Sequence, residues 1–146
     1  MTRQVRVAGW RLSCAIVATY TTAWACGGDK ATGPRACDTY AGGILAGNSS
    51  GLPGSYVLRS YCQGTKPDLP GGNGNVTLGT TDFTALIGPT TYSGTYTTAG
   101  PDGITVTLTI PFPGTFLGTY RLRNDSLAVS GTVGGQPLSL VGTRAP

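Results

Sequence analysis

The chain of 146 residues contains no histidine, and because all six of its acidic residues are aspartate it contains no glutamate either. These two residue types supply the commonest general bases and many metal ligands in proteins. The spacing of the six aspartates suggests neither a catalytic carboxylate pair nor a calcium-binding loop. No Gly-x-Ser-x-Gly motif marks a serine nucleophile. We therefore expect a protein that is not an enzyme and that carries no metal or other cofactor.

Charge is also scarce: 10 Lys and Arg stand against 6 Asp, which gives a formal net charge of +4. Three of these positive charges, Arg3, Arg6 and Arg11, lie at the N-terminus. Without them, seven basic residues face six acidic ones, and the net charge falls to +1. The basic character therefore belongs to the N-terminal segment, and we expect no binding to nucleic acid. A chain of this length has room for one domain with one modest core.

Residues 1–25 have the three regions of a secretory signal peptide. The basic start is followed by an uncharged, mostly apolar run at 12–24, and small residues, Ala23 and Ala25, occupy positions −3 and −1 before Cys26. The uncharged run is shorter than the roughly 20 residues that span a bilayer. We expect residues 1–25 to be removed as an export signal.

Cys26 opens the short polar stretch CGGDKATGP. A cysteine at the cleavage point followed by such a stretch resembles the bacterial exported lipoproteins. The resemblance implies a lipid such as palmitate on Cys26, attachment to a membrane, and a location on the periplasmic side of the cell envelope. Bulky Trp24 stands where that family usually has a small residue. Two alternatives therefore stay open, namely secretion without a lipid and an uncleaved N-terminal anchor.

The other cysteines predict a disulfide. Cys14 lies in the signal, so export leaves Cys37 and Cys62 as an even pair in an oxidising compartment. Closing that loop would add about 3 kcal/mol of stability. The sequence has no Cys-x-x-Cys motif that would favour a metal or redox role instead.

The residues between the signal and the body, 26–53, are rich in Gly, Ala, Ser and Pro. We expect this segment, here called the tether, to be flexible with one helical turn near 38–46. From residue 54 to 146 the pattern changes to alternating apolar and polar residues, bounded by turn residues, which predicts a β domain. The expected strands lie at 55–62, 76–78, 83–87, 92–96, 104–110, 116–122, 127–133 and 138–140.

Most connections between these runs are too short for a parallel crossover, so successive strands should pair antiparallel. Strict alternation predicts which side chains share a face of a strand. In the run 55–62 it places Cys62 on the same face as Tyr56 and Leu58, and in the run 104–110 it places Ile110 on the same face as Ile104. A short echo, TYSGTY at 91–96 and TFLGTY at 115–120, places a glycine between two aromatic residues on one face. Such a glycine lets a strand bend and leaves room for a neighbouring ring.

The motif Gly-x-Tyr-x-Leu occurs at 54–58 and again at 118–122. Within the alternating pattern of 52–143, it resembles the small lipocalin-like barrels of bacterial lipoproteins. Together these features predict an all-β fold, an antiparallel meander of six to eight strands that closes into a small barrel. With strands this short, we expect the side chains to fill the barrel.

Two sets of side chains are candidates for recognition. The expected interior aromatics, which would line any ligand cavity, are Tyr56, Phe83, Tyr92, Tyr96, Phe116 and Tyr120. The expected partner contacts are arginines on the outer face, Arg59, Arg121 and Arg123, for which a merely solvated strand face is the alternative.

The leading hypothesis is a non-enzymatic, membrane-tethered periplasmic protein that acts as an accessory or structural subunit of a membrane-associated complex. Its partners would be other membrane or periplasmic proteins. The second hypothesis is a lipocalin-like carrier of a small apolar ligand. A cavity larger than about 300 Å³ would favour the carrier.

Overall fold

The computed structural model describes residues 35–46, 51–66 and 74–146, which belong to one compact unit, Pro34–Pro146. The expected signal at 1–25, Cys26 and the remaining parts of the tether lie outside the described residues. The strands are β1 (Arg35–Ala36), β2 (Gly43–Ile44), β3 (Gly54–Gln63), β4 (Thr65–Lys66), β5 (Gly74–Leu78), β6 (Asp82–Ile87), β7 (Thr90–Ala99), β8 (Gly103–Ile110), β9 (Gly114–Arg123), β10 (Ser126–Val133) and β11 (Gln136–Arg144).

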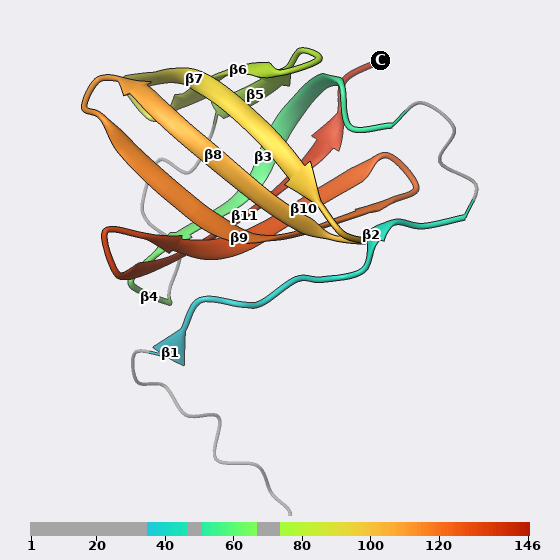
Figure 1. The fold of residues 1–146 in the computed structure, drawn as a ribbon, viewed down its shortest axis with the longest axis horizontal. Helices are drawn as coiled ribbons and strands as arrows, with labels where there is room; N and C mark the ends of the chain where they lie inside the picture. The colour runs from blue at the N-terminus through green and yellow to red at the C-terminus, as the bar shows by residue number, and fades with distance from the viewer. Residues whose placement is uncertain (1–34, 47–50, 67–73) are drawn as a thin grey trace, which may run out of the picture. The chain divides into compact units, whose positions relative to one another are not determined.

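Eight of these strands, β3 and β5 to β11, form a closed antiparallel barrel (Figure 1). Each strand pairs with the next one along the chain, and β11 pairs with β3 to close the sheet. The predicted all-β meander that closes into a barrel is therefore confirmed, and it has eight strands where six to eight were expected. Closure leaves these long strands without a free edge on which another chain could pair.

The turns have the residues that tight hairpins require. Asn124 and Asp125 join β9 to β10 with φ angles of 47° and 62°. Gly134 and Gly135 join β10 to β11 with φ angles of 56° and 79°. Two successive positive φ angles are typical of the type I′ hairpin turn, whose twist follows that of the strands. Asn, Asp and Gly adopt positive φ angles with the least strain.

The barrel has two different ends. Its closed end carries the turns at 79–81, 100–102 and 124–125, together with residues 51–53. Its other end, here called the mouth, carries the loops at 88–89, 111–113 and 134–135 and the last residues of β3. The core lies between them, and Tyr56, Leu122 and Leu127 are each only 1% exposed.

Two bulges change the faces predicted from strict alternation. In β3, Leu58 pairs with Gly142 and Ser60 with Val141, so Arg59 is an extra residue without a partner across the ladder. An extra residue reverses the alternation beyond it. The prediction that Cys62 shares the face of Tyr56 is therefore wrong: Cys62 lies on the outer face, and Tyr61 points inward.

The second bulge lies in β8, where Leu108 pairs with Gly94 and Ile110 with Ser93. Thr109 is the extra residue, and its hydroxyl donates to the Ser93 carbonyl (3.0 Å). Ile110 is consequently turned outward and is 54% exposed, contrary to the prediction that it shares the face of Ile104.

The glycine of the repeated motif allows two strands to approach closely beneath an aromatic ring. Gly118 of β9 pairs with Gly131 of β10. A Cβ atom on Gly118 would lie 2.1 Å from the Ser130 carbonyl oxygen and 2.7 Å from the Phe116 ring. No side chain fits in that space, so the prediction that this glycine leaves room for a neighbouring ring is confirmed.

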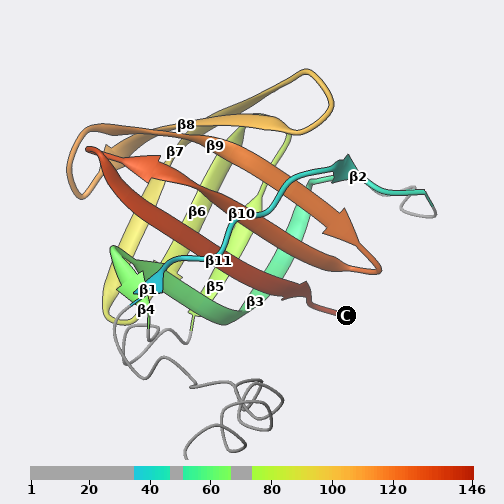
Figure 2. The same cartoon turned by 90° about the horizontal axis from the view of Figure 1, so that it is seen from below.

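Residues 37–45, here called the strap, cross the outer face of the barrel over β11, β10 and β9 (Figure 2). The Tyr40 N–H donates to the Ser130 hydroxyl (2.6 Å), and the Tyr40 carbonyl accepts from the hydroxyls of Ser130 and Thr119. Further along, β2 pairs in parallel with β9, and the Leu45 N–H donates to the Leu122 carbonyl (3.1 Å). The strap explains why outward-facing Ser130 is only 4% exposed.

The strap also corrects the prediction for residues 35–46. They were expected to belong to a flexible tether with a helical turn, but they contain β1, β2 and an extended segment and no helical turn. Their sequence is rich in small residues because the backbone, more than the side chains, makes the contacts. Their partners lie 60 or more residues away along the chain, which local composition does not reveal.

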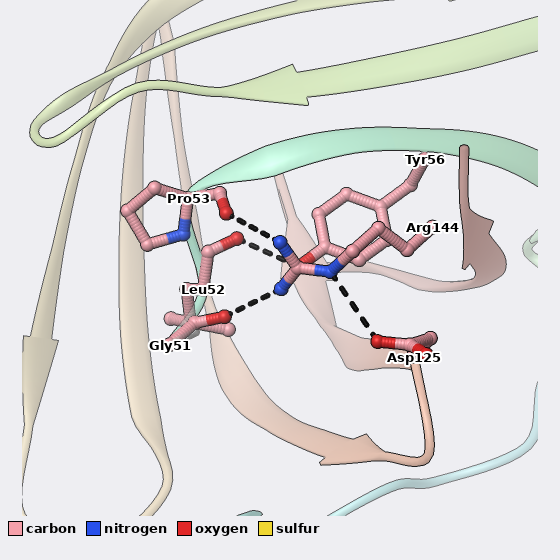
Figure 3. A network of polar contacts seen from close by, with 6 residues as sticks. All are labelled: Gly51, Leu52, Pro53, Tyr56, Asp125 and Arg144. Atoms are coloured by element: carbon pink, nitrogen blue, oxygen red, sulfur yellow. Dashed lines mark hydrogen bonds and ion pairs between the residues drawn. The ribbon is translucent and has the colours of Figure 1, made fainter. Parts of the chain in front are cut away.

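The closed end is held by Arg144 of β11 (Figure 3). Its guanidinium donates to the carbonyls of Pro53 (2.8 Å) and Gly51 (2.7 Å) and to the Tyr56 hydroxyl (2.9 Å). Its Nε lies 3.6 Å from an Asp125 carboxylate oxygen. The Tyr56 hydroxyl donates in turn to the Leu52 carbonyl (2.7 Å). These contacts fix residues 51–53 across the end of the barrel.

Candidate functional site

The barrel encloses a cavity of about 450 Å³ between the closed end and the mouth. Side chains of all eight barrel strands line it, and most of them are apolar. The expectation that the interior is filled is therefore wrong. The strands are longer than their apolar runs suggested, with ten residues each in β3, β7 and β9, and this length leaves space above the packed closed end.

Four of the six predicted cavity aromatics line this space: Phe83, Tyr92, Tyr96 and Phe116. The other two, Tyr56 and Tyr120, are buried in the core but do not contact the cavity. Tyr56 is instead part of the Arg144 network at the closed end.

The structure adds Tyr61 and Gln63 to the lining, and neither was predicted. Both follow the bulge at Arg59, which turns them inward, and they pair with the cavity residues Leu140 and Leu138 of β11. Nothing in the local sequence marks that bulge. For Tyr61 one signal was available, because strict alternation assigned this largely apolar side chain to the solvent; for Gln63 there was none.

The mouth connects the cavity with the surface. The loop at 111–113 lines it, and Phe112 in this loop is 78% exposed. An aromatic ring that both lines a cavity and faces solvent marks the point of entry. On the outer surface near this rim, Ile110 (54% exposed) and Leu86 (39% exposed) add further apolar area.

Among the described residues, the polar side chains of the cavity are few: three tyrosines, one glutamine and one threonine. At the mouth, the Tyr61 hydroxyl donates to Gln63 Oε1 (3.2 Å). Burial, and to a lesser extent the nearby Tyr92, raises the pKa of Tyr61 above its ordinary value. Towards the closed end, the Tyr96 hydroxyl donates to the Gly79 carbonyl (2.7 Å), and burial raises the pKa of Tyr96. Both hydroxyls are therefore neutral at physiological pH.

These pKa shifts predict the pH dependence of stability. The folded protein holds the phenolic protons of Tyr56, Tyr61 and Tyr96 more tightly than the unfolded chain does, because the pKa of each is raised. This contribution is complete below the ordinary pKa of 10.0 and is lost as the pH rises through the folded-state values. Without histidine, little should change between about pH 6 and about pH 9.

Urea unfolding across this range checks the prediction. The free energy of unfolding should be level up to about pH 9 and fall above about pH 10. Tyr61→Phe should make the alkaline fall smaller. A fall that begins near neutral pH would contradict the prediction.

The predicted disulfide is confirmed: Cys37 and Cys62 are bonded, with Cα atoms 5.7 Å apart. It joins the start of the strap to β3 near the mouth. Beside it, Asp38 and Lys66 form an ion pair (2.8 Å), and β1 pairs with β4. The strap is thus fastened at the mouth by a covalent bond and at the closed end by β2.

Arg121 and Arg123 both point outward from β9 and are exposed, as predicted. The guanidinium of Arg121 lies over the Tyr40 ring of the strap, 5.5 Å from its centre. Arg59 projects from β3, with β10 and β11 between it and β9, and its Nε donates to the Thr143 hydroxyl (3.4 Å). The three arginines therefore do not form one patch, and a role in partner contact stays a prediction.

Two of the described aspartates stabilise local structure. Asp102 accepts a hydrogen bond from the Gly42 N–H (2.9 Å), and Asp125 occupies a hairpin turn beside Arg144. In the described ranges, no three Cys or Asp side chains are grouped as metal ligands would be. The same part of the chain contains no helix that is long and apolar enough to cross a membrane.

Comparison with known proteins gives no relative: no protein family, no curated protein and no solved structure matches the chain. The cavity must therefore be interpreted from its own geometry.

Proposed function

We propose that this protein binds a small, mainly apolar molecule inside its barrel, as a lipocalin-like carrier does. The observation that supports the proposal is the apolar cavity of about 450 Å³, which exceeds the roughly 300 Å³ at which small-molecule sites begin. An eight-stranded meander barrel is the architecture in which lipocalins hold such ligands.

The architecture around the cavity suits a binding site. The strap and the Arg144 network brace the wall and the closed end, so the cavity is formed before a ligand arrives. A preformed site avoids the cost of ordering side chains on binding. The exposed Phe112 ring at the mouth would lose contact with water when a ligand enters, which adds to affinity.

The proposal includes the location expected from the sequence. The chain would be exported and attached by a lipid on Cys26 to the periplasmic side of a membrane. An apolar molecule in that aqueous compartment needs a protein that keeps it out of contact with water. The protein would act by binding and not by catalysis. The alternative role, an accessory subunit of a membrane-associated complex, stays a prediction, because nothing in the described residues identifies a partner surface.

A matched pair of substitutions on β8 tests the binding proposal. Val106 lines the cavity, whereas Thr107 beside it is exposed on the outer face. Val106→Trp should lower the affinity for the neutral apolar fluorophore N-phenyl-1-naphthylamine by about tenfold or more, because the indole occupies the ligand's space. Thr107→Trp adds the same ring outside the barrel and should leave the affinity unchanged.

Fluorescence titration of the full chain measures both affinities, and thermal unfolding shows that each variant is folded. If the unaltered protein does not bind the fluorophore, or if both variants bind it equally well, the carrier proposal is wrong.

A further inference from the structure

The hydrogen-bonding groups of the cavity are gathered at its mouth. Tyr61 is 6% exposed, and its hydroxyl donates to Gln63 Oε1 at the rim (3.2 Å). Thr90 and Tyr92 lie in the same part of the lining, at the start of β7. Deeper in the barrel, the Tyr96 hydroxyl is already engaged by the Gly79 carbonyl (2.7 Å). A ligand would therefore find its polar contacts at the mouth and an apolar wall below.

The lining is also uncharged. None of the described residues that line the cavity is Asp, Lys or Arg. An ionised group that moved into this lining would lose its water without gaining an opposite charge, which is strongly unfavourable. The site therefore favours a neutral ligand over an anion of the same size.

The volume limits the ligand's size. If one heavy atom with its hydrogens takes a share comparable to the roughly 30 Å³ of a water molecule, about 450 Å³ holds about 15 heavy atoms, and somewhat more at the denser packing of a protein interior. This corresponds to a medium-length chain or a compact ring system.

From these observations we infer that the cavity selects an uncharged, mainly apolar molecule that carries a hydroxyl group, and that this hydroxyl lies between Tyr61 and Gln63 at the mouth. The inference rests on the proposed binding function and names the chemical class of its ligand. Because the Tyr61 proton is directed to Gln63, the free lone pairs of Tyr61 Oη accept the hydrogen bond of the ligand hydroxyl. The amide N–H groups of Gln63 can donate to the ligand oxygen in return.

Three probes of the same chain length, 1-decanol, decanoate and decane, test this selection. Each is titrated against N-phenyl-1-naphthylamine bound to the full chain, at neutral pH, where decanoate is ionised, and its affinity is read from the displacement of the fluorophore. Decanol should bind about tenfold or more tightly than decanoate, because the lining offers no cation.

The positioning of the hydroxyl is tested by Tyr61→Phe, which removes the acceptor and keeps the ring. It should lower the affinity for decanol by about three- to tenfold and leave decane binding unchanged. The matched control is Tyr96→Phe, which removes a hydroxyl at the far end of the same cavity. This change should leave the ratio of the decanol and decane affinities as it was.

The outcomes separate the two proposals. If the fluorophore and decane bind but decanoate binds as tightly as decanol, the inferred selectivity is wrong while the binding function stands. Tyr61→Phe and Tyr96→Phe are compared by the ratio of the decanol affinity to the decane affinity. If Tyr61→Phe changes this ratio no more than Tyr96→Phe does, the inferred position of the hydroxyl is wrong, and the binding function again stands. If none of the probes binds, the binding function itself fails.

Discussion

Replacing Arg144 with alanine should lower the free energy of unfolding by about 3 kcal/mol, measured by urea denaturation. The guanidinium donates to two backbone carbonyls, of Gly51 and Pro53, and to the Tyr56 hydroxyl, and it stacks over the Tyr56 ring. Hydrogen bonds from a charged group contribute more than neutral ones. Their loss would free residues 51–53, which hold the closed end, and leave the buried Tyr56 hydroxyl with one partner fewer.

Two further variants identify the cause. Tyr56→Phe should cost about 1 kcal/mol, and the double variant should lose less than the sum of the two, because both side chains belong to one network. Arg123→Ala is the matched control, since it removes an exposed arginine at the same end of the barrel, on β9, and should change stability by less than about 0.5 kcal/mol. If Arg144→Ala costs no more than Arg123→Ala, the network does not hold the closed end.

No pattern in the sequence indicates this network. Arg144 stands near the C-terminus among small and turn-forming residues, and the groups that accept its hydrogen bonds lie 88 or more residues earlier in the chain. Two of them are backbone carbonyls. Because every residue has one, the sequence cannot show which carbonyl accepts a hydrogen bond. Only closure of the barrel, which brings β11 beside β3, makes the contact.

The strands themselves were predictable because alternation reflects a physical requirement. A strand with one face in a core and one in solvent must repeat with a period of two, as Ile104, Val106 and Leu108 do between threonines. All eight expected runs are strands. The errors occur where one inserted residue reverses the period, at Arg59 and Thr109.

The cavity could be predicted only in part. Phe83, Tyr92, Tyr96 and Phe116 were placed on the inner face by alternation, and they line the cavity. Whether inward side chains meet across a barrel or leave a space depends on its diameter and on the length of its strands. Those are properties of the whole sheet, and no single run of residues encodes them.

Removing the disulfide with Cys37→Ser and Cys62→Ser should also lower the free energy of unfolding by about 3 kcal/mol, since the bond restricts a loop of 25 residues in the unfolded chain. The loss should appear in the strap first, because the bond fastens the strap covalently at the mouth, while all of its other contacts with the barrel are non-covalent. Hydrogen exchange at the Tyr40 and Leu45 amides should therefore speed up more than exchange at the amides of β7, on the far side of the barrel.

A reducing agent provides the control for this prediction. It should destabilise the unaltered protein to the level of the double-serine variant and leave that variant unchanged. Equal acceleration of exchange in the strap and in β7 would mean that the bond stabilises the barrel as a whole and does not act through the strap. If the stability of the variant equals that of the unaltered protein, the bond contributes nothing, and the hydrogen bonds of Tyr40 to Ser130 and of Leu45 to Leu122 suffice to hold the strap in place.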